Sequence, residues 1–194
     1  MKVLLSLTVV VASLLGTVAM AAEAVDLKVG DKAPTFEALD DSGKPWKSSE
    51  HVGKKIVVVY FYPADMTGGC TKQACGFRDK LSDLSKKGIE VVGVSGDSVA
   101  SHVLFKQEYD LTFPLLADTE GKVASAFGVP VTPGEKKVNA KFKTGKEEVL
   151  IRNVTTARWT FVIDKDGKIA VKNTKVAAAE DSQAVLDAIE KLSK

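Results

Sequence analysis

The chain contains two cysteines, Cys70 and Cys75, which stand five positions apart and are its clearest candidates for chemistry. A cysteine thiolate is a nucleophile that can be oxidised to a sulfenic acid and then to a disulfide. If both cysteines lay in one intact helix, their Cα atoms would be roughly 8 to 9 Å apart. A disulfide needs no more than about 7 Å, so bonding them would require the helix to unwind. Because the bond would close so short a loop, it would add little stability. We therefore favour a disulfide that forms and breaks during a reaction cycle over a permanent one.

A strand, a turn and a helix are predicted around the two cysteines. Residues 55–61 carry an apolar, β-branched and aromatic run that is typical of a buried strand. In residues 76–87, apolar side chains recur at helical spacing. Proline and glycine between these segments indicate a turn, so that Cys70 falls in the first turn of the helix. Unpaired backbone N–H groups and the positive end of the helix dipole favour a thiolate there.

Three short segments surround the cysteines: Phe61-Tyr62-Pro63, Thr67-Gly68-Gly69-Cys70-Thr71 and Ala74-Cys75-Gly76-Phe77-Arg78-Asp79. Together they resemble the active-site signature of the peroxiredoxins. The resemblance is closest to the bacterioferritin comigratory protein, or peroxiredoxin Q, branch, whose resolving cysteine follows the peroxidatic one by five residues. One departure is that this branch usually has proline where the chain has Gly68, which makes the loop more flexible. Residues 30–36 are also similar to the N-terminal segment of many peroxiredoxins.

The resemblance implies a role for each residue of this loop. Cys70 corresponds to the peroxidatic cysteine, which attacks a hydroperoxide and becomes a sulfenic acid. The Thr67 hydroxyl and the backbone N–H of Gly69 or Cys70 would hold the two peroxide oxygens. Pro63 would pack over the site and limit water. Cys75 would be the resolving cysteine, forming an intramolecular disulfide with Cys70 after the start of the helix unwinds.

An arginine is expected beside the sulfur. Arg158 opens a predicted strand, residues 158–164, that should lie next to the Cys70 loop, and the resemblance identifies it with the active-site arginine of the family. A guanidinium there would favour the thiolate and orient a peroxide oxygen. From the residues alone, a surface arginine at a strand end is an equally good interpretation. Arg78 lies about two helical turns from Cys70, roughly 12 Å by helical rise, and is expected to pair with an acidic neighbour or a loop.

The resemblance as a whole implies a thioredoxin-dependent type of peroxiredoxin, an atypical two-cysteine thiol peroxidase. Its substrates would be hydrogen peroxide and organic hydroperoxides. A thioredoxin-like or other external dithiol would reduce the disulfide. No cofactor and no metal are expected, and the protein is expected to be a monomer.

Two other functions remain open. An exported copper chaperone of the thioredoxin fold would use two cysteines and a histidine as soft ligands. His51 and His102 lie in a predicted loop and a predicted helix without ligand spacing, and a solvated side chain is the preferred interpretation of each. A protein thiol-disulfide oxidoreductase normally carries Cys-x-x-Cys, so the five-residue offset and Thr67 count against it.

The first 21 residues have the character of a cleavable signal peptide. Lys2 gives a basic start, residues 3–18 are mostly apolar, and Ala19-Met20-Ala21 supplies a small-x-small cleavage pattern. The apolar run is short and interrupted for a membrane span, although an uncleaved anchor remains an alternative. We therefore expect export, to the periplasm or the exterior if the host is bacterial, without stable membrane association after cleavage. Of 27 basic residues, 26 remain without Lys2, against 25 acidic ones, a balance that does not indicate a nucleic-acid partner.

Residues 22–194 are expected to form a single domain. The further predicted elements are a strand pair within residues 29–43, a strand at 89–95, a helix from the Ser98 N-cap to Tyr109, a strand at 113–118, a helix at 120–127 capped by Thr119, a hairpin within 131–157 turning at Thr144-Gly145, a hairpin within 158–171, and a final helix burying Val185, Ala188, Ile189 and Leu192. The lysine-rich residues 131–157 are interpreted as a solvated excursion rather than a partner-docking patch. This order predicts an α/β, thioredoxin-like fold: a central mixed sheet flanked by helices, with an N-terminal β-hairpin extension.

Overall fold

The computed structural model describes residues 25–192, and the predicted signal peptide, residues 1–21, lies outside them. The strands of the main sheet are β1 (Glu37–Asp40), β2 (Pro45–Lys47), β3 (Ile56–Phe61), β4 (Ile89–Ser95), β5 (Leu115–Ala117), β8 (Trp159–Ile163) and β9 (Ile169–Asn173). They lie in the order β2-β1-β5-β4-β3-β8-β9. The β3–β4 and β4–β5 pairs are parallel and the other pairs are antiparallel. The predicted central mixed sheet is confirmed.

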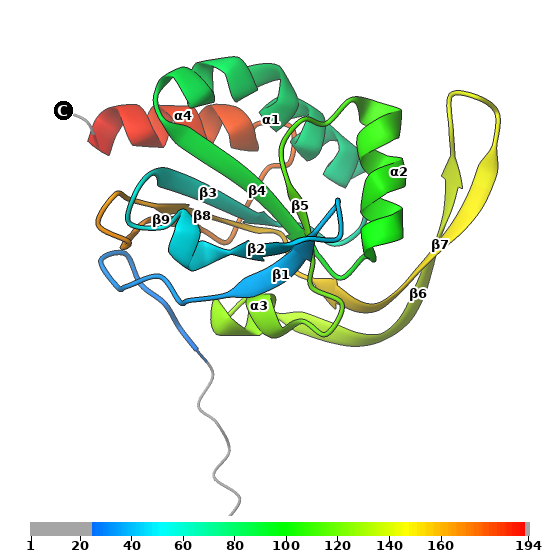
Figure 1. The fold of residues 1–194 in the computed structure, drawn as a ribbon, viewed down its shortest axis with the longest axis horizontal. Coiled ribbons are helices and arrows are strands. Elements are labelled where there is room, and N and C mark those ends of the chain that lie inside the picture. Colours follow the sequence, from blue (N-terminus) through cyan, green and yellow to red (C-terminus); the bar gives the residue numbers. More distant parts are fainter. Residues whose placement is uncertain (1–24, 193–194) are drawn as a thin grey trace, which may run out of the picture.

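Helices cover both faces of this sheet (Figure 1). They are α1 (Gly68–Lys86), α2 (Val99–Tyr109), α3 (Lys122–Ala126) and α4 (Asp181–Leu192), with a short 3-10 helix η1 (Ser48–Glu50) after β2. Side chains of α1, α2 and α4 share one hydrophobic core, whereas α3 belongs to a second core on the other face. Alternate residues of β3 enter the two cores, Val58 and Tyr60 the first, Val57 and Val59 the second. The run at residues 56–61 is continuously apolar because both faces of this strand are buried.

A two-stranded hairpin, β6 (Val131–Lys141) and β7 (Glu147–Thr156), projects beyond α2 (Figure 1). The predicted hairpin in residues 131–157 is therefore confirmed, with its turn around Thr144-Gly145. Most of its side chains are exposed. Its tip is held by α2, where the backbone N–H of Lys143 donates to Glu108 Oε1 at 2.8 Å. Its base is held by Thr156, whose hydroxyl donates to the backbone oxygen of Tyr62 at 2.9 Å.

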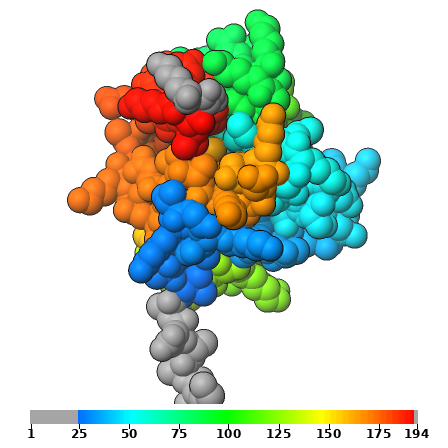
Figure 2. All heavy atoms as spheres, turned by 90° about the vertical axis from the view of Figure 1, so that its left-hand side faces the viewer, coloured from blue at the N-terminus to red at the C-terminus, as the bar shows by residue number. Residues whose placement is uncertain are grey.

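The N-terminal strand pair lies later in the chain than predicted. β1 and β2 pair across the turn at residues 40–44, whereas residues 29–36 form no strand. This segment instead lies against β9 and the turn before it, as the neighbouring blue and orange surfaces in Figure 2 show. The backbone N–H of Gly30 donates to Ile169 O at 2.8 Å, and that of Ala33 to Gly167 O at 2.9 Å. Pro34 lacks the N–H that a longer ladder would need.

Two predictions about helices α3 and α4 are wrong in detail. The N-cap of α3 is Gly121 rather than Thr119, and the carboxylate of Asp118 accepts from the backbone N–H groups of Val123 and Ala124 at 3.0 and 2.8 Å. Leu192 of α4 is 57% exposed, since the helix ends beyond the edge of the core, and Leu186 is buried instead. The predicted helix from the Ser98 N-cap to Tyr109 is confirmed as α2. Within residues 25–192, every helix is too short or too polar to cross a bilayer.

Candidate active site

Cys70 lies in the first turn of α1, immediately after the C-terminal end of β3. The first i–4 hydrogen bond of the helix joins the N–H of Thr71 to Thr67 O at 2.8 Å, so the N–H groups of Gly69 and Cys70 precede the helical ladder. Cys70 is nonetheless only 2% exposed, because its side chain packs into the core beneath α1. The predicted position of Cys70 at a helix start is therefore confirmed.

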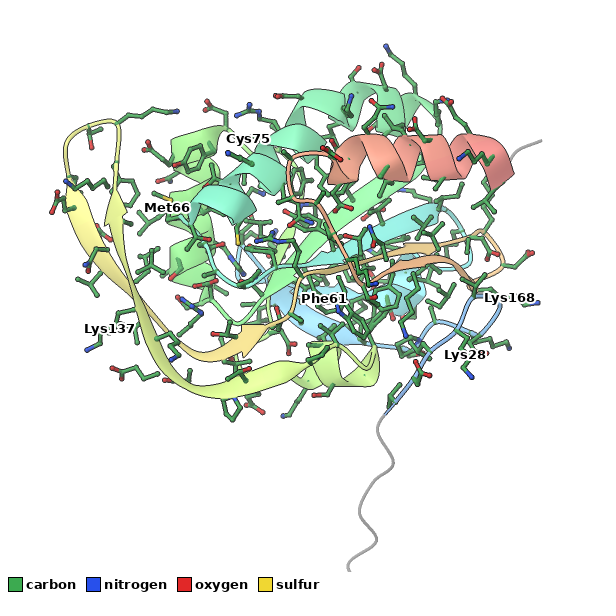
Figure 3. All side chains as sticks on the ribbon, turned by 180° about the vertical axis from the view of Figure 1, so that it is seen from behind. Lys28, Phe61, Met66, Cys75, Lys137 and Lys168 are labelled. Carbon is green, nitrogen blue, oxygen red and sulfur yellow. The ribbon has the colours of Figure 1, made fainter. Side chains whose placement is uncertain are left out.

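The loop before the helix bends sharply at Met66. Its φ of 58° is in the left-handed region that non-glycine residues adopt uncommonly. The next residue, Thr67, is the N-cap of α1, but its hydroxyl does not cap the helix and donates to Ala64 O at 3.0 Å. Pro63 is half-buried in the same loop. Figure 3 places Met66 just before α1 and Cys75 within it, at the end of the molecule where the hairpin rises.

Arg158 reaches the sulfur directly. It precedes β8, and the antiparallel register of β3 and β8 pairs Phe61 with Trp159, so Arg158 emerges where the Cys70 loop begins. Its Nη2 lies 3.1 Å from Cys70 Sγ. A Cβ atom built on Gly69 would lie 3.4 Å from the same nitrogen, so the glycine leaves room for the guanidinium. The proximity that the sequence predicted is present, and the alternative of a free surface arginine is wrong.

Gln73 and Asp181 extend this contact inward, and sequence reasoning missed both. Arg158 Nη1 donates to Gln73 Oε1. The amide nitrogen of Gln73 donates to Asp181 Oδ2 at 2.7 Å, and the hydroxyl of Thr160 donates to the same oxygen at 2.7 Å. Burial raises the pKa of the Asp181 carboxyl, while the bonds from Thr160 and Gln73 and the charge of Arg158 oppose the rise. The signal that could have found Gln73 is its position, one helical turn after Cys70.

A buried polar network anchors the other side of the loop. His102 and Asp65 are fully buried, and His102 Nδ1 lies 2.8 Å from Asp65 Oδ2. The hydroxyl of Tyr62 donates to Asp65 Oδ1 at 2.7 Å, and the backbone N–H of Asp65 donates to Asp97 Oδ2 at 2.9 Å. The prediction of a solvated His102 is therefore wrong, because the side chain turns inward from α2 to pair with the loop.

The charges of this network perturb one another. Burial raises the pKa of Asp97 to about 6, and the negative charge of Asp65 adds to the rise. Burial opposes the charged form of His102, but the charge and hydrogen bond of Asp65 outweigh it, so the pKa of His102 is raised. Asp65 thus lies between His102 and the carboxyl of Asp97, five residues before Cys70.

The two histidines do not come together with the cysteines. His51 lies near the start of β3, stacked on Trp46 at a centroid distance of 4.4 Å, with Nδ1 2.9 Å from Glu90 Oε2. It is therefore neither fully solvated nor near the Cys70 loop, which follows the other end of β3. No group of three or more His, Cys, Asp or Glu suited to a metal occurs among the residues that the structure describes. Both histidines are used in pairs with carboxylates, which leaves the copper-chaperone alternative without support.

Cys75 lies in the same intact helix as Cys70, is partly exposed and is a free thiol. The structure therefore shows the arrangement expected before a disulfide forms, and the disulfide itself stays a prediction. Arg78, a turn further on, donates to Asp79 Oδ1 at 2.9 Å and to Tyr109 O at 2.6 Å. Its expected pairing with an acidic neighbour is confirmed, and its second partner is the last residue of α2 rather than a loop.

Comparison with known proteins identifies the relatives of this fold and site. Residues 29–172 match the AhpC/TSA family. The chain is 38% identical over 167 residues to peroxiredoxin Bcp of Bacillus subtilis, an overlap covering 86% of this chain and 98% of that protein. It superposes on peroxidoxin BcpB from Mycobacterium tuberculosis with a TM-score of 0.70 and 32% identity, over 86% of this chain and 99% of that one.

A second solved relative is the bacterioferritin comigratory protein of Xanthomonas campestris, whose structures were used to study its alkyl peroxide reduction activity. The TM-score is 0.66 at 30% identity, covering 82% of this chain and 92% of that one. These neighbours are thioredoxin-fold peroxiredoxins, so the predicted fold class is confirmed. The chain belongs to the AhpC/TSA family and, within it, to the peroxiredoxins of the bacterioferritin comigratory protein and peroxiredoxin Q type.

Proposed function

We propose that this protein is a thiol-dependent peroxidase that reduces hydrogen peroxide and organic hydroperoxides through Cys70. The observation that carries the proposal is the 3.1 Å contact between Arg158 Nη2 and Cys70 Sγ at the start of a helix. A guanidinium and unpaired N–H groups at one sulfur favour its anionic, nucleophilic form. Membership of a peroxidase family and the alkyl peroxide activity studied in the X. campestris relative support the same substrate class.

In the first step, the Cys70 thiolate attacks the terminal oxygen of the hydroperoxide and the O–O bond breaks. The sulfur becomes a sulfenic acid, and the other oxygen leaves as an alkoxide or hydroxide that takes up a proton. The Thr67 hydroxyl, the N–H groups of Gly69 and Cys70, and Arg158 are assigned to hold the two oxygens in line and stabilise the developing charge. Pro63 limits the access of water.

In the second step, Cys75 condenses with the sulfenic acid, which releases water and forms an intramolecular disulfide. Both cysteines lie in one continuous helix, in which Cα atoms five positions apart are too distant for a disulfide, so the turns that contain them must first unwind. An external dithiol, thioredoxin-like or other, then returns both cysteines to thiols by exchange. In an exported protein this donor belongs to the outer compartment.

The test is rapid mixing of the reduced protein with a hydroperoxide, followed by mass analysis of the sulfur. We expect Cys70→Ser to abolish peroxide consumption. Cys75→Ser is the matched variant: it should keep one round of reduction, accumulate sulfenic acid at Cys70 and lose recycling by dithiols. Unchanged peroxide turnover in Cys70→Ser would overturn the assignment.

We also propose that the protein is exported after cleavage near Ala21 and acts as a monomer. The composition of residues 1–21 supports export. Intact-mass analysis of protein recovered from cell fractions tests the cleavage and the compartment together. Sedimentation analysis of the mature protein tests the monomer.

A further inference from the structure

A continuous hydrogen-bonded chain links the sulfur of Cys70 to helix α4. It runs from Cys70 to Arg158, from Arg158 to Gln73, and from Gln73 to Asp181, the first residue of α4. Gln73 is fully buried and Asp181 is 2% exposed, so water does not replace these bonds. More than a hundred residues separate Gln73 from Asp181 in the sequence, and the two meet because α1 packs against α4.

The chemistry of an amide makes this chain directional. Gln73 offers one oxygen acceptor and one NH2 donor, whereas Arg158 can only donate. The oxygen of Gln73 must therefore face Arg158, and its NH2 group then needs an acceptor on the opposite side. Asp181 supplies that acceptor. Without it, the amide could turn over and present its N–H groups to the guanidinium, which would push Arg158 away from Cys70.

We propose that Asp181 is a positioning residue for Cys70, whose carboxylate fixes the amide of Gln73 and, through it, the guanidinium of Arg158 on the sulfur. Thr160 donates to the same oxygen, Asp181 Oδ2, and so aims the carboxylate. The other oxygen, Oδ1, is buried without a hydrogen-bond partner among residues 25–192. A buried carboxyl with one oxygen left without a hydrogen bond lowers the stability of the fold. The role of Asp181 in orienting Gln73 gives a reason why a carboxyl lies at this position.

The proposal deepens the proposed function and rests on it for the identity of the reacting sulfur. Gln73 lies between Cys70 and Cys75 on α1, in the turns that must unwind for the disulfide to form. Unwinding therefore separates Gln73 from Asp181. The contact that prepares Cys70 for peroxide thus opposes the later reaction with Cys75, and its removal should affect the two steps in opposite directions.

The first measurement uses no peroxide, so that it is independent of the enzymatic activity. In a Cys75→Ser background, the rate of alkylation of Cys70 by iodoacetamide is followed as a function of pH. Asp181→Ala should slow alkylation at neutral pH by about tenfold, the effect of partly losing a cation beside the sulfur, and shift the profile to higher pH. Val185→Ala is the matched control, because Val185 is a buried apolar residue of the same helix and should leave the profile in place.

A reversal of the hydrogen bond provides the decisive variant pair. Gln73→Glu alone should slow alkylation, since it sets two carboxylates against each other where a 2.7 Å hydrogen bond now lies. Gln73→Glu combined with Asp181→Asn should recover most of the rate, because the introduced amide can donate to the introduced carboxylate. A double variant no faster than Gln73→Glu would overturn the proposal, as would an Asp181→Ala profile equal to that of Val185→Ala.

The second measurement uses protein that retains Cys75 and follows, after one equivalent of hydrogen peroxide, the rate at which Cys70 sulfenic acid that has already formed is converted to the disulfide. Asp181→Ala should form the bond faster than the parent and faster than Val185→Ala. An equal or slower rate would overturn the predicted opposition between the two steps. If the parent protein ignored peroxide while its alkylation responded as expected, the proposed function would fail and the positioning role of Asp181 would stand.

Discussion

Replacing Arg158 with methionine removes the N–H groups that reach the sulfur while it keeps much of the side-chain length. The substitution breaks the hydrogen bond from Nη2 to Cys70 Sγ at 3.1 Å, together with the bond to Gln73. A hydrogen bond to a charged group contributes about 1.5–3 kcal/mol. Since about 1.4 kcal/mol of barrier corresponds to a tenfold change in rate, the reaction of the reduced protein with peroxide should slow roughly 10- to 150-fold.

The assay is the second-order rate constant of sulfenic acid formation, measured by rapid quenching and mass analysis in a Cys75→Ser background. Arg158→Lys should fall between the parent and Arg158→Met, because lysine keeps the charge without the planar fork that contacts two partners at once. Arg78→Met is the matched control, since Arg78 bonds to Asp79 and the backbone of Tyr109. A charged hydrogen bond predicts a reduction of the rate constant of roughly tenfold or more. A rate constant for Arg158→Met within a factor of about two of the parent would therefore refute the reasoning.

Three further predictions concern the loop and its buried anchor. Gly68→Pro should raise the free energy of unfolding in urea by about 0.4–1 kcal/mol, because Gly68 begins α1 and Thr67 has the extended ψ of 144° that suits a residue before proline; a loss of stability would contradict this. His102→Ala should lower that free energy by about 3 kcal/mol or more, because it leaves the buried Asp65 without its partner; a loss below about 1 kcal/mol, the worth of an exposed pair, would count against the anchor. Asp97 has a pKa of about 6 in the folded protein against 3.8 as its ordinary value, so the fold retains a proton that the unfolded chain releases, and stability should fall as pH rises from about 4 to 6. Asp97→Asn should remove that part of the pH dependence of the urea midpoint. Identical pH profiles for the parent protein and the variant would show that Asp97 does not cause it.

Local sequence signals predicted the parts of the fold that depend on neighbouring residues. The run at residues 56–61 specified β3 because no polar side chain interrupts it. Ser98 specified the start of α2, and its hydroxyl accepts from the N–H of Ser101 as an N-cap should. The start of α3 was not decided by the sequence, because Asp118 and Thr119 can both bind free helical N–H groups. In the structure the carboxylate of Asp118 binds them, and Gly121 is the N-cap.

The sequence predicted the site residues that belong to the family motif, but not the residues that hold them in place. Arg158 could be placed beside Cys70 because a strand order expected from the family carries it there. The partners that fix these residues come from distant segments: Asp181 is brought to Gln73 by the packing of α4, and His102 to Asp65 by the packing of α2. No characteristic spacing in the sequence reveals that the members of such a pair lie in contact. A lone histidine on a helix is usually solvated, and only the tertiary structure reveals the acidic residue that buries this one.

The left-handed backbone of Met66 has an energetic consequence for the proposed reaction cycle. A residue with a Cβ atom in this conformation raises the energy of the chain by roughly 1–2 kcal/mol, and Met66 lies four residues before Cys70. That energy is held only while the loop keeps its present shape. In the proposed unwinding of the first turns of α1, relaxation of the Met66 torsion would offset part of the free-energy cost of opening the helix. Glycine at position 66 would adopt the same torsion without this cost. The helix with its first turns unwound would then be less populated than in the parent protein.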